Sequence, residues 1–145
     1  MAVYFDAGLF LKLYLNEPDS PKALSLAARL TSPICLTPFL RAELVNALRC
    51  KEGRGEMTGA DVTKALADLR ADIRSGYIVR AEPDWNRVFA GTMRLSQVHA
   101  STTLCRTLDA IHVASALHLG IGEFATADKR QSTLAKAAGL TVMGI

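Results

Sequence analysis

The chain has 145 residues, of which half are hydrophobic and 21% are charged, and it carries a formal net charge of +3. This length predicts one folded domain over residues 1–145, and this balance excludes a disordered or fibrous chain. The small excess of positive charge permits an anionic partner without requiring one.

Short apolar runs alternate along the chain with longer amphipathic stretches, which predicts strands alternating with helices. In chain order, the pattern predicts a strand over 2–6, helices over 8–15 and 20–30, a strand over 33–37, helices over 37–53 and 58–76, a strand over 77–83, helices over 84–100 and 107–117, a strand over 123–128, a helix over 129–139 and a strand over 140–145. Strands separated by helices favour an α/β fold, a three-layer α/β/α arrangement with a central, mainly parallel sheet.

Capping residues and glycines mark several of the helix boundaries. Ser20, Thr37 and Asp84 stand where predicted helices begin, and a proline follows each of the first two. Such residues are typical of a helix start. Gly53 and Gly76 close two amphipathic stretches, which is typical of a helix end.

No segment of the sequence predicts a membrane protein. The apolar N-terminal stretch is interrupted by Asp6 and Lys12, is too short to span a bilayer and has no basic segment before it. We therefore expect a cytoplasmic protein with no membrane partner. The cysteines are odd in number and lack CxxC spacing, which indicates small core residues rather than disulfides or a zinc site. They are Cys35, Cys50 and Cys105.

Four acidic residues stand in apolar surroundings. Asp6 ends the first predicted strand, and Asp128 follows the apolar run EFATA. Because ligands of parallel sheets lie beyond the carboxyl ends of the strands, both side chains are expected at one edge. Glu43 lies in the helix that leaves the second strand, and Asp109 lies in the first turn of TLDAIHVASAL, which has no polar face. The topology can bring all four carboxylates to one rim.

Each carboxylate also has a simpler structural interpretation. The two aspartates that follow strands are suited to capping a turn or a helix. Glu43 can pair with Arg41 or Arg49 on the helix surface, and Asp109 can pair with Arg106. These alternatives stay open for each residue taken alone, and the coincidence of all four is the stronger signal.

Four carboxylates at one rim repel one another, and a divalent cation is the simplest compensation. All-oxygen ligation suits Mg²⁺, with Mn²⁺ as a substitute, better than zinc, which prefers histidine and cysteine. Three polar residues, each close in sequence to one of the acids, are expected to support them: Asn46, His112 and Thr126.

Four stretches in this order resemble those of a PIN domain: DAGLFLKLYL, RAELVNALR, LDAIHVASAL and FATADKRQSTLAKAAGLTV. More narrowly, they are similar to the VapC toxins, the ribonuclease halves of bacterial and archaeal toxin–antitoxin pairs. The resemblance covers nearly the whole chain and is weakest between residues 53 and 99. It implies a small α/β domain with an acidic Mg²⁺ or Mn²⁺ site that cleaves RNA, forms a homodimer and is neutralised by a cognate antitoxin.

The acid positions of the family fall on the same four residues: Asp6, Glu43, Asp109 and Asp128. The resemblance therefore implies that these carboxylates bind the metal and serve catalysis. PIN domains usually carry serine or threonine two residues after the first aspartate, where this chain has Gly8. The missing hydroxyl removes a supporting hydrogen bond, which is expected to lower efficiency rather than change the reaction.

The expected chemistry is hydrolysis of the phosphodiester bond by water that a metal ion activates. Basic residues near the motifs are expected to guide the anionic RNA backbone, although each is equally suited to a solvated surface. They are Arg49, Lys51, Arg54, Arg106, Lys129 and Arg130. The half-apolar composition leaves surface for the partner copy to cover, and the long helix over 58–75 is the expected place.

Two other classes of protein remain open. A PIN-like module that has lost activity and only binds a partner would be consistent with Gly8. A phosphoaspartate protein also places an aspartate at the end of its first strand. However, DAGLF lacks the second aspartate and the threonine of the phosphatase motif, and no paired acids precede Asp6 as in a receiver domain.

Overall fold

Five short strands form one sheet in which every neighbouring pair is parallel. The order across the sheet is β3-β2-β1-β4-β5, so the first strand lies at the centre. The computed structural model describes residues 1–145. Its strands are β1 (Val3–Phe5), β2 (Ile34–Leu36), β3 (Ile78–Arg80), β4 (Glu123–Ala125) and β5 (Thr141–Met143).

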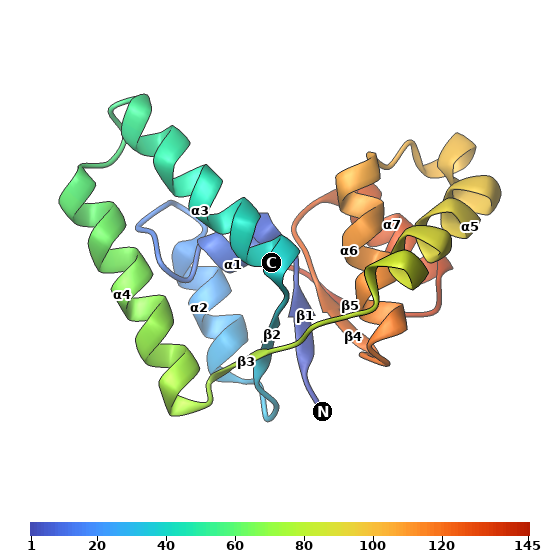
Figure 1. Cartoon of the computed structure of the whole chain (residues 1–145), viewed down its shortest axis with the longest axis horizontal. Coiled ribbons are helices and arrows are strands. Elements are labelled where there is room, and N and C mark those ends of the chain that lie inside the picture. The colour runs from blue at the N-terminus through green and yellow to red at the C-terminus, as the bar shows by residue number, and fades with distance from the viewer.

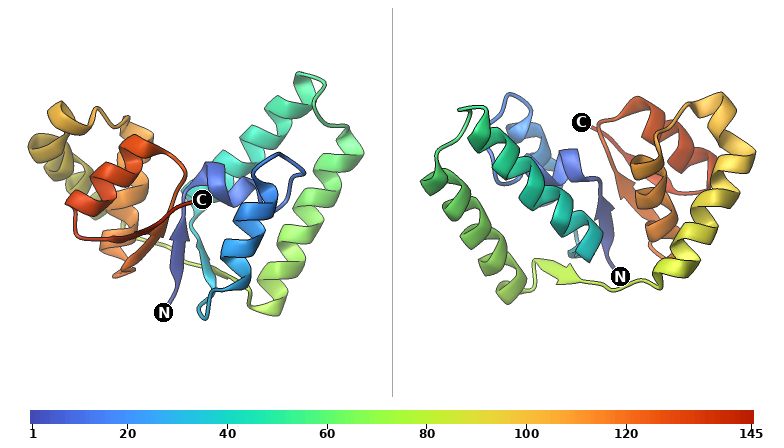
Figure 2. Two further views of the ribbon diagram at one scale, coloured as in Figure 1. Left: turned by 180° about the vertical axis from the view of Figure 1, so that it is seen from behind. Right: turned by 45° about the horizontal axis from the view of Figure 1, so that its top comes forward.

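Seven helices cover the sheet. Figure 1 shows α1 to α4 on one side of the strands and α5 to α7 on the other, and both views of Figure 2 agree. The predicted three-layer α/β/α arrangement is confirmed, with a sheet that is parallel throughout. The helices are α1 (Ala7–Leu11), α2 (Ser20–Ala28), α3 (Pro38–Gly53), α4 (Gly59–Ser75), α5 (Trp85–Thr103), α6 (Thr107–His118) and α7 (Lys129–Ala137).

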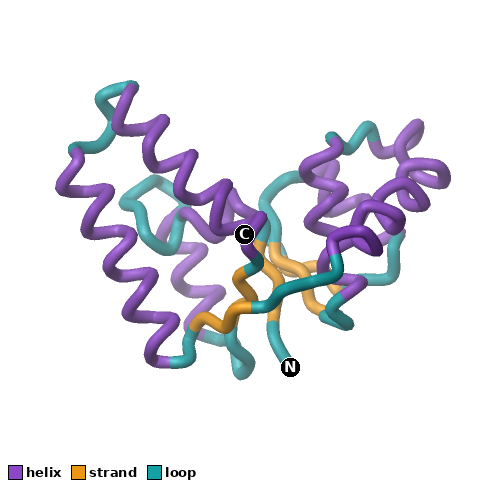
Figure 3. Tube along the Cα trace, in the orientation of Figure 1, coloured by secondary structure: helices purple, strands orange, loops and turns teal.

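The sheet is buried on both faces because successive side chains of a strand point in opposite directions. Val3 and Phe5 pack with α1 to α4 in a cluster of 18 buried residues. Tyr4 lies on the other face and packs with Phe124, α6 and α7 in a cluster of 10 buried residues. The strands therefore separate two cores, and Figure 3 shows them between the two groups of helices.

The predicted caps position most of the helices. Thr37 accepts a hydrogen bond from the N–H of Leu40 at 3.1 Å and begins α3. Asp84 accepts from the N–H of Arg87 at 3.3 Å and begins α5. Gly76 ends α4 with φ of +82°, a left-handed conformation that glycine adopts without strain.

The predicted cap at Ser20 is wrong by one residue, because Asp19 occupies that position. The Ser20 hydroxyl instead donates to the carbonyl of Leu15 at 2.7 Å and accepts from the N–H of Glu17 at 3.0 Å. It therefore fixes the preceding loop, after a first helix that ends at Leu11 rather than at residue 15.

Two further expectations concern the cysteines and membrane-spanning helices. Cys35 is buried as predicted, but Cys50 is exposed and Cys105 is half-buried, so the three cysteines are not uniformly core residues. None of the helices combines the length and the apolar character that crossing a membrane requires.

Candidate acidic site

Asp6 links the end of β1 to the start of α1. Its Oδ1 accepts the N–H of Leu9 at 2.8 Å and caps the helix, while its Oδ2 accepts the hydroxyl of Thr126 at 2.8 Å. The side chain is buried. Burial raises the pKa of Asp6, and the nearby negative charge of Asp109 raises it further.

Asp128 is the residue at which α7 begins, and it follows β4, the strand that pairs with β1. Its Oδ1 accepts the N–H of Gln131 at 2.8 Å, and its own N–H donates to the Thr126 hydroxyl oxygen at 3.0 Å. Asp6 and Asp128 therefore share one threonine, and both also serve the capping role that the sequence left open. Thr126 lies against the carboxylate of Asp6 and so occupies the supporting place expected for it.

Gln131 belongs to this group of residues, and the sequence analysis missed it. Its side chain is fully buried, with Oε1 at 2.7 Å from the Thr126 hydroxyl and Nε2 donating to the backbone carbonyl of Asp109 at 3.2 Å. The signal available in the sequence was a polar residue on the same face of α7 as the buried Leu134 and Ala135.

Asp109 has a partner within its own helix turn. The Nε of Arg106 lies 3.1 Å from its Oδ2, so the ion pair that the sequence left as an alternative is formed. The helix is also not buried all round, because Leu108 and Leu117 are exposed and only the residues from Ala110 to Ala116 are buried. The Asp109 side chain is half-buried, at 21% exposure, so the expectation of a helix buried on every face is wrong at this end.

Glu43 meets a histidine rather than an arginine. Its Oε2 lies 2.5 Å from Nε2 of His112, whose Nδ1 lies 2.8 Å from the hydroxyl of Tyr4. Arg49 pairs with Glu52 instead. His112 supports a carboxylate as expected, although it supports Glu43 and not its neighbour in sequence.

A pocket of about 370 Å³ brings two of the acids together with basic residues. Asp109 and Asp128 line it from α6 and from the start of α7. Three of the six basic candidates line the same pocket: Arg106, Lys129 and Arg130. The pocket therefore joins negative side chains, suited to a cation, to positive ones, suited to an anionic backbone.

The other predicted contacts lie elsewhere on α3. Asn46 is exposed and does not line this pocket. The remaining basic candidates are paired with acids near the end of the helix, Arg49 with Glu52, Lys51 with Glu17 and Glu56, and Arg54 with Glu56. These ion pairs place the three side chains apart from the acidic pocket.

The four carboxylates are suited to a divalent ion in chemistry but do not form a compact ligand set as they stand. No three histidine, cysteine, aspartate or glutamate side chains lie together in a metal-site arrangement. Each acid is instead held by a protein donor. Oxygen atoms such as those of carboxylates are the ligands that Mg²⁺ and Mn²⁺ prefer, so the chemistry of these residues fits either ion. Asp109 could bind such an ion only after its ion pair with Arg106 opens.

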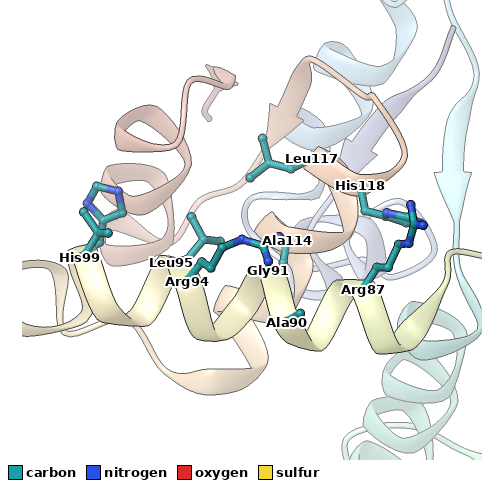
Figure 4. A pocket seen from close by; sticks show the side chains of 10 residues that line it. Arg87, Ala90, Gly91, Arg94, Leu95, His99, Ala114, Leu117 and His118 are labelled. Atoms are coloured by element: carbon teal, nitrogen blue, oxygen red, sulfur yellow. The ribbon is translucent and has the colours of Figure 1, made fainter.

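A larger pocket of about 660 Å³ lies between α5 and α6, away from the carboxylates. Figure 4 shows Arg87, Arg94, His99 and His118 around it. His118 accepts the N–H of Asp84 at 3.1 Å and so helps to begin α5. This pocket has no acidic side chain in its lining, whereas two of the four predicted acids, Asp109 and Asp128, line the smaller one.

Comparison with known proteins shows to which family the chain belongs. The model of the PIN domain matches residues 3–137. The chain belongs to the PIN domain family. This PIN domain is 33% identical over 144 residues to "Ribonuclease VapC46" of Mycobacterium tuberculosis, covering 98% of this chain and 96% of that protein. The predicted relation to the VapC-type PIN domains is confirmed.

Solved structures share the fold of this PIN domain at low sequence identity. VapC20 of M. tuberculosis, described as a sarcin-ricin loop cleaving toxin, aligns with a TM-score of 0.68 and 15% identity over 97% of each chain. VapBC2 of Rickettsia felis, bound to a DNA fragment from its promoter, gives 0.67 and 9% over 100% of this chain and 99% of that chain. FitAcB of Neisseria gonorrhoeae gives 0.62 and 16% over 97% and 96%.

The raised pKa of Asp6 predicts that the metal-free protein loses stability as the pH rises. The folded state holds this proton more tightly than the unfolded state, whose aspartate titrates near pH 3.8, so the free energy of unfolding falls from that pH through the higher folded-state pKa. In chelator, we expect the contribution of Asp6 to make the Tm fall as the pH rises above its unfolded value of 3.8, and the fall to be smaller for Asp6→Asn.

Exposed Asp68, paired with Lys64 on α4, offers the control. Asp68→Asn should keep the pH dependence of the wild type. Equal pH dependence in the wild type and Asp6→Asn would contradict the assignment of this effect to Asp6.

Proposed function

We propose that this chain is a divalent-metal-dependent endoribonuclease, the toxin of a toxin–antitoxin pair that acts on RNA in the cytoplasm. The observation that carries the proposal is the joining of three aspartates through Thr126 and Gln131, beside a pocket that also holds three basic side chains. The relative at 33% identity, named a ribonuclease, supports the same reaction.

The proposed metal ligands are Asp6, Asp109 and Asp128, with Glu43 completing the acidic set. A bound Mg²⁺ or Mn²⁺ would neutralise charge on the scissile phosphate and activate a water molecule. The protein holds Asp6 from both sides, through the N–H of Leu9 and the hydroxyl of Thr126. A carboxylate fixed in this way loses little further freedom when it binds a cation, so the site is prepared for the ion.

Arg106, Lys129 and Arg130 are the proposed contacts of the RNA backbone. They line the pocket that also contains Asp109 and Asp128, so a phosphate bound to them lies next to the acids. Asp109 would hold the cation, and Arg106, which pairs with Asp109 in this structure, would then have a phosphate as its alternative partner.

We also propose a homodimer that binds a small antitoxin. Large apolar side chains are exposed on α5, and two of them, Phe89 and Met93, are one helical turn apart on the same face. Helix α4, where the sequence analysis expected the covered surface, buries Val62, Ala65 and Leu69 within its own chain. An exposed apolar patch of this kind is typical of a protein interface, so α5 is the better place for the second copy.

RNA cleavage should disappear in EDTA and return with Mg²⁺ or Mn²⁺. Asp109→Asn removes a proposed ligand and keeps the shape of the side chain, so the purified variant should not cleave RNA at either ion. Asp68→Asn, an exposed change on α4, should cleave as the wild type does. Cleavage at full rate in excess chelator would exclude the metal mechanism, and RNA binding without cleavage by the wild type would favour an inactive binding module.

Gly8→Ser should increase RNA cleavage, by about tenfold, because it supplies the hydroxyl that this site lacks. A Cβ atom at Gly8 would lie 4.0 Å from both carboxylate oxygens of Asp6 and meet nothing closer. Gly8→Ala is the matched control, since it improves the helix by about 0.5–1 kcal/mol without adding a hydroxyl. An equal rate in both variants would show that the hydroxyl has no role.

Sedimentation velocity at tens of micromolar should give the mass of two copies. Met93→Glu places a charge on the exposed face of α5 and should shift the protein towards one copy. Leu24→Glu makes the same change at an exposed position of α2 and should leave the dimer intact. A single copy in the wild type, or dissociation by Leu24→Glu alone, would contradict the proposed interface.

A further inference from the structure

A chain of hydrogen bonds connects the centre of the sheet with Glu43. The hydroxyl of Tyr4 on β1 lies 2.8 Å from Nδ1 of His112 on α6, and Nε2 of His112 lies 2.5 Å from Oε2 of Glu43 on α3. Tyr4 and His112 are buried at 0% and 2% exposure. The chain therefore joins the strand at the centre of the sheet to a helix from each of its two outer layers.

For an ionised Glu43 and a neutral His112, the partners fix the direction of these hydrogen bonds. An ionised Glu43 carboxylate only accepts, so Nε2 of His112 must carry a hydrogen. In a neutral imidazole the other nitrogen is then an acceptor, and it can receive the hydroxyl hydrogen of Tyr4. Tyr4 thus selects the tautomer of His112 that donates to Glu43.

Aromatic neighbours hold the imidazole in place. The ring of Tyr4 meets His112 edge-on with centroids 5.7 Å apart, and the ring of Phe39 lies 4.8 Å away on another side. Tyr4 itself stacks on Phe124 at 5.4 Å. Because these rings belong to the packed interior, His112 cannot turn away from Glu43 without disturbing the core.

Glu43 differs from the other acids in what holds it. Asp6 and Asp128 are short side chains fixed by backbone N–H groups at helix starts. Glu43 lies within α3, carries a longer and more flexible side chain and contacts no such group. Its carboxylate therefore depends on the imidazole of His112 for its position.

We infer that Tyr4 and His112 are positioning residues, which hold the Glu43 carboxylate towards α6, the helix that also carries Asp109. This inference rests on the proposed function, because it assigns Glu43 to the metal-binding acids. Tyr4 does not touch the substrate and acts through His112, although its hydroxyl also lies near those of Thr37 and Ser115. The loss of such an outer hydrogen bond typically costs 10–100-fold in metal affinity or activity, by order of magnitude.

The test compares Tyr4→Phe with Tyr14→Phe. Both variants lose the hydroxyl of a tyrosine that hydrogen-bonds another side chain, but Tyr14 donates to Asp72 at 2.6 Å, apart from the acids. Mn²⁺ affinity is measured by titration calorimetry, and folding by circular dichroism. We expect Tyr4→Phe to weaken Mn²⁺ binding at least tenfold and to lower kcat with an unchanged KM for RNA. Tyr14→Phe should change neither.

A double variant separates positioning from general damage. With Glu43→Gln already present, adding Tyr4→Phe should cost no further Mn²⁺ affinity, because both changes remove the same contribution. Additive losses would overturn the inference. So would a Tyr4→Phe protein that binds Mn²⁺ as the wild type does.

The wild type alone gives an independent readout. Nitrogen NMR of the imidazole, assigned with His112→Gln, should show hydrogen on Nε2 and none on Nδ1. Hydrogen on Nδ1, or on both nitrogens, would overturn the role given to Tyr4. Suppose that Tyr4→Phe binds Mn²⁺ more weakly than the wild type, but the wild type does not cleave RNA. This result would overturn the proposed function and leave the positioning role intact. A wild type that binds no Mn²⁺ would overturn both.

Discussion

Like charges gathered at the carboxyl end of a parallel sheet must be compensated, and here the hydroxyl of Thr126 stands at the centre of that compensation. It lies 2.8 Å from Asp6 and 2.7 Å from Gln131, and it accepts the N–H of Asp128 at 3.0 Å. A hydroxyl has one hydrogen, so it donates to Asp6 or to Gln131 but not to both at once. Through Gln131 the same contact reaches the backbone of Asp109. The charge of Asp6 is therefore coupled to the orientation of three chain segments.

Each of the four acids has its own compensating donor. Asp6 and Asp128 face the first turns of α1 and α7, where the free N–H groups and the helix dipole favour negative charge. Asp109 faces Arg106, and Glu43 faces an imidazole. Each carboxylate is thus drawn towards its own donor rather than towards a common centre. A cation that gathers them competes most directly with Arg106, whose side chain is 76% exposed and free to leave.

The fold supplies this edge because its strands all run in one direction. Parallel strands need crossover connections, and these connections place helices on both faces of the sheet. The carboxyl ends of β1 and β4, which are neighbours, then bring Asp6 close to Thr126 although 120 positions separate them in the chain. The exposed apolar side chains of α5 belong to the outer layer of helices.

The sequence by itself determined what depends on short spacing. Alternating apolar runs and amphipathic stretches predicted the α/β layers, and Asp6 and Asp128 could be placed at one edge because each directly follows a strand. Only the tertiary structure decided the partners. Local spacing suggested the ion pair of Arg106 with Asp109, which is formed. It also suggested an arginine for Glu43, but folding brought His112 to it from α6. A contact of this kind joins distant segments and depends on how whole helices pack against the sheet. The local spacing of residues in the sequence does not encode that packing.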